Sequence, residues 1–498
     1  MSKDIVFITV PKLDPGMPIV GPAILKSQLA ANNFSSIYMD FNIYLYNRMS
    51  ECHELWWGDE HPCWLDLDLL IADYGPQLQQ PTFDFAKEVL KHDPKWIGIT
   101  QFSTTSQAPS ILLIKALKKL GFKGKFVLGG PAAMLFHSET PIVSMVDYII
   151  YGEGEESLVK LLKGATSGPG INTKNFQQLQ NLDKYPFPDY SDLNLTEYSS
   201  EGRILYMAAS RGCVRNCAFC DIHAMAPKFK FRSGELLARE VLYQSRKHPS
   251  VNVIRWADSL YNGAMREFHI FLDEIIKYKE QGLLRKDMEF AGQCIVRPKR
   301  QCPPWYFEKM AKAGILSQDL GIESGSEKVR DHMDKKFNNE DLDHYIEMSH
   351  KHGLGITALM MVGYPTETEE DFQETLNLFT RHKKHKSAFH TVILGGTFIF
   401  MPHAPIWHMQ EELNIKYNAR NDWYNENSTF KERMARRERL KKHIKKLGFK
   451  MPKDVHNKVI KKYFDKDVEK KNKKSYNEFW GYTGKSLEME PKRIEMAI

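Results

Sequence analysis

Two series of apolar segments alternate with amphipathic helical patterns along this chain. In the first series, apolar runs at 4–10, 35–41, 95–100, 125–130 and 146–152 predict strands. Continuous apolar strands that alternate with helices are typical of a parallel α/β sheet covered on both faces. We therefore expect residues 1–165 to form a flavodoxin-like or Rossmann-like domain, with an insertion of short helices over 42–90.

The second series predicts six β/α units. Its expected strands lie at 204–210, 251–258, 288–296, 315–324, 354–363 and 391–400. This pattern predicts a partial (β/α)6 barrel of TIM type over residues 204–405. Residues 166–203 contain GATSGPG and YPFPDY and predict a linker, because proline favours extended backbone before it. Beyond the barrel, residues 406–498 predict a basic helical C-terminal region.

Charge and hydropathy narrow the functional classes. The chain has no apolar run near the roughly eighteen residues of a membrane span, and MSKDIVFITV lacks the zones of a secretory signal, so we expect a cytoplasmic protein.

Residues 431–474 carry about nineteen Lys or Arg against about six Asp or Glu, although the net charge of the whole chain is only +7. Such charges more often form a solvated helix face, so nucleic acid is not the favoured partner. A metal-stabilised nucleic-acid-binding protein is the alternative from another class.

Three of the seven cysteines crowd into the stretch RGCVRNCAFC. Cys213, Cys217 and Cys220 could hold one face of a [4Fe–4S] cluster from a single loop and leave one iron open. With His223 they could instead form a closed zinc site, but such sites usually draw their ligand pairs from two separate turns. The remaining cysteines are scattered, and we expect most of them to be small core residues: Cys52, Cys63, Cys294 and Cys302.

The cysteine stretch resembles a known family. CVRNCAFC resembles the CxxxCxφC signature of radical S-adenosylmethionine (SAM) enzymes, in which φ is aromatic. LGIESGSE (320–327) and MMVGYPTETEEDF (360–372) resemble later motifs of that family, and WADS (256–259) lies where many relatives carry an acidic pair. The resemblance implies a [4Fe–4S] cluster that cleaves SAM to a 5′-deoxyadenosyl radical, with an external electron donor of the flavodoxin or ferredoxin type. It implies three cluster ligands, Cys213, Cys217 and Cys220, and SAM contacts from Phe219, Asp258, Gln293, Arg297, Glu323 and Ser324.

The first domain resembles the cobalamin-binding domain of one class of these enzymes. FVLGGP (126–131), DYIIYGEGEESL (147–158) and the linker stretch LDKYPFPDY carry this likeness. The loop at 10–21 departs from other cobalamin domains because it lacks their cobalt-binding histidine. Glycines at the strand ends would let the main chain approach a corrin ring, although they also suit ordinary strand-to-helix turns. The resemblance implies cobalamin contacts from Ser103, Thr104, Gly129, Gly130, Gly152 and Glu153.

Together these features predict a cobalamin-dependent radical SAM methyltransferase that acts on an unactivated carbon of a small-molecule or peptide substrate. The first alternative is a radical SAM enzyme without cobalamin or without methyl transfer, which would catalyse a cyclisation, rearrangement or oxidation. A methylthiotransferase acting on tRNA is less favoured. That family carries three further cysteines in its first domain, where only Cys52 and Cys63 are available here.

Overall fold

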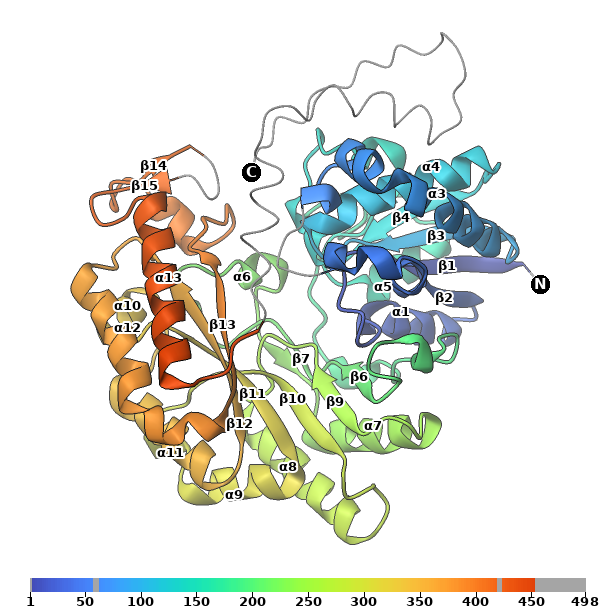
Figure 1. The fold of residues 1–498 in the computed structure, drawn as a ribbon. Coiled ribbons are helices and arrows are strands. Elements are labelled where there is room, and N and C mark those ends of the chain that lie inside the picture. Colours follow the sequence, from blue (N-terminus) through green and yellow to red (C-terminus); the bar gives the residue numbers. More distant parts are fainter. Residues whose placement is uncertain (1, 57–61, 419–422, 453–498) are drawn as a thin grey trace. The chain divides into compact units, whose positions relative to one another are not determined.

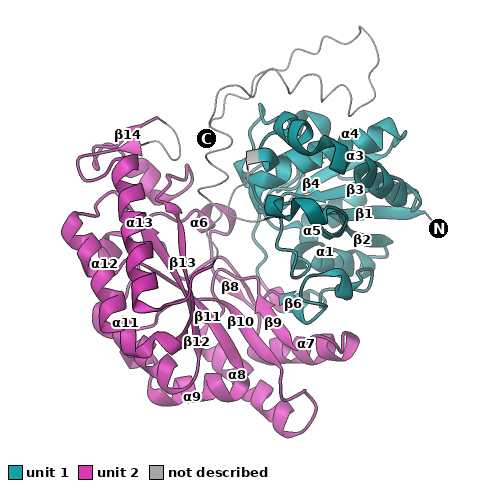
Figure 2. Ribbon diagram, in the orientation of Figure 1, with its two compact units in different colours: residues 1–180, 184–206, 454–490 teal, residues 181–183, 207–453, 491–498 magenta. Residues whose placement is uncertain are grey.

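The computed structural model describes residues 2–56, 62–418 and 423–452, which form two compact units (Figures 1 and 2). Among these residues, unit 1 contains 2–180 and 184–206, and unit 2 contains 181–183 and 207–452. The boundary falls inside strand β6 (Ile204–Met207). In the described part of the chain we find no helix with the length and apolar character that crossing a membrane requires.

Unit 1 contains a five-stranded parallel sheet with the strand order β2-β1-β3-β4-β5. The strands are β1 (Lys3–Thr9), β2 (Ser36–Asp40), β3 (Pro94–Thr100), β4 (Lys125–Gly129) and β5 (Tyr148–Ile149). This is the flavodoxin-like order, so the predicted fold class of the first domain is confirmed. The middle of β1 is almost fully buried because helices cover both faces of the sheet (Figure 1).

Five helices surround this sheet. They are α1 (Val20–Ala30), α2 (Phe41–Arg48), α3 (Leu67–Leu90), α4 (Gln107–Lys119) and α5 (Gly154–Leu162). Helices α1 and α5 contact each other, and α3 contacts α4. The predicted insertion of short helices over 42–90 is wrong for its second half, because α3 runs for 24 residues through Pro76 and Pro81. Each proline removes one main-chain hydrogen bond, but a continuous buried face that includes Leu70, Tyr74 and Leu78 sustains the helix.

Unit 2 contains a six-stranded sheet with the order β13-β12-β11-β10-β9-β6, in which β9 to β13 are parallel. Its further strands are β9 (Val253–Trp256), β10 (Glu289–Cys294), β11 (Ile315–Glu323), β12 (Gly355–Val362) and β13 (Phe389–Thr397). The helices between them are α7 (Gly234–Lys247), α8 (Met265–Glu280), α9 (Pro304–Ala313), α10 (Glu327–His332), α11 (Asn339–Lys351) and α12 (Glu369–Arg381). The predicted partial (β/α)6 barrel is therefore confirmed.

The two faces of this sheet differ in burial. Residues that face the helices, such as Ile254, Leu320 and Ile356, are completely buried. On β9 to β11 the opposite, inner face carries mostly small and polar side chains, and an Arg255–Asp319 ion pair spans β10 there. Packed barrels of this type fill their interior with large apolar side chains, whereas this part of the inner face is polar.

The C-terminal region is less uniformly helical than its basic pattern predicts. A short antiparallel ladder of β14 (Lys416–Tyr417) and β15 (Trp423–Tyr424) precedes helix α13 (Phe430–Leu447). The aromatic residues favour this ladder because they pack edge-on against other rings, as Trp423 does against Phe400. A capping box of Thr429 and Glu432 begins α13. The rest of the predicted helical region, residues 453–498, lies outside the described residues.

Candidate functional site

The three clustered cysteines lie on one loop at the carboxyl end of β6 in unit 2. A two-stranded antiparallel ladder of β7 (Ser210–Arg211) and β8 (Lys230–Phe231) closes the base of this loop, which also contains the short helix α6 (Ile222–Met225). Gly212 has a φ of +75°, and a Cβ there would lie 2.9 Å from the carbonyl oxygens of Ala226 and Lys228. The loop therefore requires glycine at its entrance.

The cysteine thiols are partly buried and lie in a polar main-chain environment. The Cys220 N–H donates to the Cys217 carbonyl at 3.0 Å, and the Arg215 N–H donates to Cys213 Sγ at 3.4 Å. Burial raises the pKa of all three thiols, that of Cys220 to about 11. Lys335 and Arg215 oppose this effect at Cys213 and Cys217. These cations would favour thiolates over thiols once a metal is bound.

The guanidinium of Arg215 is a second feature of this loop. Its Nε and Nη2 atoms are buried and have no hydrogen-bond acceptor among the described residues. Burial, and then the nearby Arg297, lowers the pKa of Arg215. Buried charged donors without acceptors are rare in folded proteins, so this group favours an anionic occupant beside Cys213 and Cys217.

His223 does not take the position of a fourth ligand. Its Nε2 lies 2.7 Å from the Arg215 carbonyl oxygen, and its Nδ1 lies 3.4 Å from that of Pro227. Across the residues with described positions, no three His, Cys, Asp or Glu side chains converge as the ligands of a single metal ion would. A cubane cluster differs from a single ion because each thiolate binds a different iron, and it therefore accepts more widely separated thiols.

Two of the predicted SAM-site residues meet through a lysine that the sequence analysis did not single out. Lys335 Nζ lies 3.1 Å from Glu323 Oε1 and 5.5 Å from the centroid of the Phe219 ring. Glu323 ends β11 with a φ of +65°, a strained conformation that holds its side chain in this direction. The DKK run after α10 gives no local signal for this role, because it resembles an ordinary charged turn.

Two other predicted residues form internal contacts. Asp258 is buried and accepts hydrogen bonds from the Ala209 N–H at 2.9 Å and from the Ser210 hydroxyl at 2.8 Å. The buried Ser324 hydroxyl accepts from the Ser326 N–H at 3.1 Å. In this structure Asp258 thus holds the start of the cysteine loop, and Ser324 holds the turn that follows β11.

The last two predicted SAM contacts lie near the end of β10. The Gln293 side chain is exposed on the inner face of the sheet. Arg297 Nη2 donates to the carbonyls of Asn262 and Gly263 at 2.6 and 2.5 Å, while its buried Nε finds no acceptor among the described residues. Gln293 and one edge of Arg297 therefore remain available to a ligand.

The predicted cobalamin residues of unit 1 divide into two groups. Ser103 and Thr104 follow β3, Gly129 ends β4 and Gly130 follows it, so all four lie at the carboxyl edge of the sheet. Gly130 has a φ of +105°, and a Cβ there would lie 2.6 Å from the Gln101 carbonyl oxygen. A Cβ added at Gly129 would lie no closer than 3.8 Å to any heavy atom outside residues 128–130.

The second group contacts the linker. A Cβ at Gly152 would lie 2.3 Å from the ring of Phe176. Glu153 Oε2 accepts a hydrogen bond from the Leu179 N–H at 2.5 Å. An exposed aromatic residue that the sequence analysis missed, Phe102, lies beside Ser103, with 49 % of its surface accessible. The open part of this edge is therefore formed by Phe102, Ser103 and Gly129.

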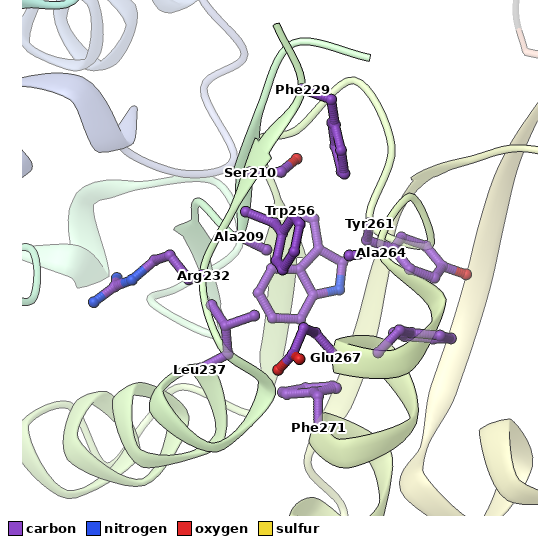
Figure 3. A pocket seen from close by; sticks show the side chains of 12 residues that line it. Ala209, Ser210, Phe229, Arg232, Leu237, Trp256, Tyr261, Ala264, Glu267 and Phe271 are labelled. Carbon is purple, nitrogen blue, oxygen red and sulfur yellow. The ribbon is translucent and has the colours of Figure 1, made fainter. Parts of the chain in front are cut away.

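A separate aromatic hollow lies on the helix-facing side of the barrel sheet (Figure 3). Trp256, Tyr261 and Phe271 line it, together with Phe268 of α8 and Leu237 of α7. None of the residues predicted for the cluster, SAM or cobalamin lines this hollow. It belongs to the packing between the sheet and helices α7 and α8.

Comparison with known proteins places these features in a family. Residues 207–379 match the Radical SAM superfamily. An uncharacterized methyltransferase of Pyrococcus horikoshii is 24 % identical over 319 residues, which cover 59 % of this chain and 65 % of the relative. A putative methylthiotransferase of Methanocaldococcus jannaschii is 28 % identical over 244 residues, 46 % of this chain and 51 % of the relative. The chain thus spans less than two thirds of the length of these relatives.

Two solved structures share the fold across both units. The radical SAM methyltransferase TsrM of Kitasatospora setae, with cobalamin and a [4Fe–4S] cluster bound, superposes with a TM-score of 0.59 at 14 % identity, covering 83 % of this chain and 75 % of TsrM. The cobalamin-dependent SAM radical enzyme OxsB, with aqua-cobalamin bound, gives a TM-score of 0.62 at 16 % identity, covering 84 % of this chain and 62 % of OxsB. Residues 207–379 thus match the radical SAM superfamily, and the fold of the chain is similar to that of TsrM and OxsB.

Proposed function

We propose that this chain is a cobalamin-dependent radical SAM methyltransferase that acts on carbon in a small-molecule or peptide substrate. In this proposal residues 1–165 bind cobalamin, 166–203 link the domains, and 204–405 hold the cluster and SAM. The observation that carries the proposal is the loop of Cys213, Cys217 and Cys220, closed by the β7–β8 ladder at the carboxyl end of a partial barrel. Barrels of this type hold their chemistry at that end.

The donor set of this loop fits a [4Fe–4S] cluster. Three thiols on one loop leave one iron of a cubane open to a further ligand. Beside these thiols, two buried nitrogens of Arg215 have no acceptor within the described part of the chain, and cluster-bound thiolates would supply acceptors for them. When bound, the cluster supplies the electron that cleaves SAM, and an external electron donor replenishes it.

Residues around the loop are suited to bind and orient SAM. Phe219 offers an aromatic face next to the Lys335–Glu323 pair. Gln293, on the inner face of β10, and Arg297, in the loop after β10, keep polar atoms available. We assign Phe219, Gln293, Arg297 and Glu323 to direct SAM contact, and Asp258 and Ser324 to holding the adjacent turns.

The carboxyl edge of unit 1 fits a large, flat cofactor that is recognised by its shape. A Cβ at Gly129 would make only ordinary contacts, with its nearest neighbour 3.8 Å away, and Phe102 presents an exposed ring at the same edge. Ser103 and Thr104 add hydroxyl groups at the same edge. The likeness in fold to TsrM and OxsB, both solved with cobalamin, supports this assignment. When bound, cobalamin would supply the methyl group for transfer.

The methylthiotransferase alternative has sequence support from the Methanocaldococcus jannaschii relative. Cys52 and Cys63 are the cysteines of unit 1, and both are buried. Two buried thiols do not provide the three ligands of a second cluster, so methyl transfer is the better-supported activity.

The test is anaerobic reconstitution followed by assay with methyl-labelled SAM. We expect about four iron per chain, bound cobalamin, 5′-deoxyadenosine, and label transferred to substrate. Stoichiometric zinc without SAM cleavage would overturn the assignment to radical chemistry. SAM cleavage in protein that does not bind cobalamin would favour the cobalamin-free cyclase, rearrangement or oxidation enzyme instead.

A further inference from the structure

The middle of the cysteine loop is fixed by main-chain hydrogen bonds on both sides. Ala218 lies between Cys217 and Phe219, and its N–H donates to the Met333 carbonyl at 3.0 Å. The Ala218 carbonyl accepts from the Ile406 N–H at 2.8 Å. Met333 follows α10, inside the residues that match the superfamily, whereas Ile406 lies after them. The loop is therefore held partly by a segment outside the superfamily match.

That segment also covers the loop with apolar side chains. Phe398, Phe400 and Trp423 are buried in one cluster with Ala218 and Tyr364. The Trp423 ring lies edge-on to the rings of Phe400 and Phe398, with centroids 5.1 and 5.7 Å apart. Its Nε1–H donates to the Phe398 carbonyl at 3.0 Å. Because protein interiors have few voids, a shift of one side chain in this cluster should displace its neighbours, including Ala218.

Helix α13 fastens this cluster through buried Arg433. The Arg433 guanidinium lies 3.9 Å from the centroid of Trp423, and its Nη1 donates to the Trp423 carbonyl at 3.0 Å. The Arg433 side chain fills the space beside Gly363, where a Cβ would lie 2.3 Å from Arg433 Cγ and Cδ. Gly363 has a φ of +77°, so both conformation and space require glycine.

Arg436, one turn further along α13, holds the turn after β12. Its Nη1 donates to the Glu367 carbonyl at 3.0 Å and lies 3.3 Å from Glu367 Oε1. Glu367 Oε2 accepts from the Gly363 N–H at 3.2 Å. Tyr364, in the same turn, belongs to the apolar cluster, and its hydroxyl lies 2.9 Å from His332 Nδ1. Arg436 thus holds the turn that contains Tyr364, and Arg433 holds Trp423. Tyr364 and Trp423 both pack in the cluster that contains Ala218 of the cysteine loop.

These contacts also explain why α13 is rich in arginine. Arg433, Arg436 and Arg437 are all buried, and Arg437 Nε donates to the Gly395 carbonyl at 3.0 Å. Buried arginines are retained where they satisfy main-chain carbonyls and carboxylates. These three of the ten Lys and Arg residues in 431–452 are therefore directed inward, at the ends of β12 and β13.

We propose that residues 398–418 and 423–437 position the cysteine loop, with Arg433 and Arg436 as the positioning residues. The inference rests on the proposed function, because it gives the C-terminal segment a role in the cluster site. Loss of Arg436 should release the turn after β12, and loss of Arg433 should release Trp423. Either change should loosen the packing over Ala218. The loop should then open locally while the barrel remains folded.

The experiment measures peptide-resolved alkylation of cysteines in the metal-free, full-length protein. We expect Arg433→Met and Arg436→Met each to raise the labelling rate of Cys217 and Cys220 by about tenfold. Arg436→Lys, which keeps the charge next to Glu367, should restore most of the protection. After reconstitution, SAM cleavage per cluster should fall in the two Met variants and recover in Arg436→Lys.

Lys279→Met is the matched control. Lys279 is also a partly buried cation, and it donates to the carbonyls of Met288 and Ala313 at 2.6 and 2.8 Å, at the opposite end of the sheet. It should leave the labelling of Cys217 and Cys220 unchanged.

Three outcomes overturn the inference. They are wild-type labelling rates in both arginine variants, equal acceleration in Lys279→Met, and a parallel rise at the fully buried Cys294, which would report global unfolding. A wild-type protein that fails to cleave SAM would refute the proposed function, whereas the labelling rates would still decide this inference.

Discussion

The carboxyl edges of the two parallel sheets are built on different principles. In unit 2, the edge carries a loop with three thiols, which is held by a strand ladder, by main-chain hydrogen bonds and by the buried carboxyl groups of Asp258 and Glu367. In unit 1, the edge presents main chain at Gly129 and an exposed ring at Phe102. The first edge can bind through specific donor atoms, and the second through shape.

This difference decides what each edge demands of its residues. A cluster ligand cannot be replaced by another residue type, because only a thiolate forms the bond to iron under these conditions. A surface that receives a flat ring tolerates many side chains, provided that the main chain stays close. Substitutions should therefore have all-or-none effects in unit 2 and graded effects in unit 1.

The largest expected effect is loss of the cluster. Replacing Cys213, Cys217 and Cys220 together by Ala should lower iron to background and abolish SAM cleavage, since each thiol is a proposed ligand. Iron analysis and quantification of 5′-deoxyadenosine measure this result. Cys302→Ala is the control, because Cys302 is a buried cysteine outside the loop sequence 213–220, and the variant should leave both quantities intact. Iron retained by the triple variant would contradict the ligand assignment.

A graded effect is expected at the edge of unit 1. Gly129→Ala should change the free energy of unfolding by less than about 0.5 kcal/mol, because a Cβ fits there, yet weaken cobalamin binding by roughly tenfold. Gly130→Ala should destabilise unit 1 by about 1–3 kcal/mol, since its φ is positive and the Gln101 carbonyl blocks a Cβ. Urea denaturation and absorbance titration with hydroxocobalamin separate the two. Wild-type cobalamin affinity in Gly129→Ala would show that the ring does not approach this position.

A smaller effect should appear in the pH dependence of stability. Burial raises the pKa of Glu367 to about 7, although Arg436 opposes this. Because the native state holds this proton more tightly than the unfolded chain, its contribution is complete below about pH 4.5 and is lost as the pH rises through 7. Stability at pH 6 should therefore exceed that at pH 8 by about 1 kcal/mol from this group. Glu367→Gln should remove that difference in denaturation experiments, and an unchanged pH dependence would contradict the assignment.

The smallest expected effect concerns the cobalt of bound cobalamin, whose electron spin should show no coupling to a nitrogen of the protein. The loop at 10–21 has no histidine, so bound Co(II) cobalamin should lack nitrogen superhyperfine splitting from a protein ligand. His137→Ala should leave the electron paramagnetic resonance spectrum unchanged, although His137 follows β4 on the carboxyl side of the sheet. Splitting that is present in the wild-type protein and disappears in this variant would show that His137 binds the cobalt. Unit 1 would then bind its cofactor through a specific donor atom, as proposed for unit 2, and the contrast between the two edges would be lost.

The sequence predicted most of the architecture because its signals are local. Period-two and period-3.6 patterns are set by neighbours in the chain, so the strands of both sheets and most helices could be assigned. The cysteine spacing is equally local, because one short loop carries all three thiols. Most of the four other cysteines were expected in the core, and all four are buried: Cys52, Cys63, Cys294 and Cys302.

Local rules misled where packing outweighed them. Pro76 and Pro81 predict breaks, but the buried face of α3 sustains one helix through both. The basic pattern after residue 406 predicts helix, but Tyr417 and Trp423 pair in a short ladder instead. In both places the apolar surface that decides the structure is provided by residues distant in sequence.

The sequence by itself determined which atoms could bind a cluster, because thiol chemistry and loop spacing are properties of the chain. Only the tertiary structure decided what surrounds them: Lys335 beside Glu323, two buried Arg215 nitrogens with no acceptor among the residues it describes, and the Ile406 N–H hydrogen-bonded to the Ala218 carbonyl. These partners are separated by up to 188 residues (406 − 218) and follow no periodic pattern. Their contacts arise from the burial of whole elements against one another, a free energy that no local stretch of sequence contains.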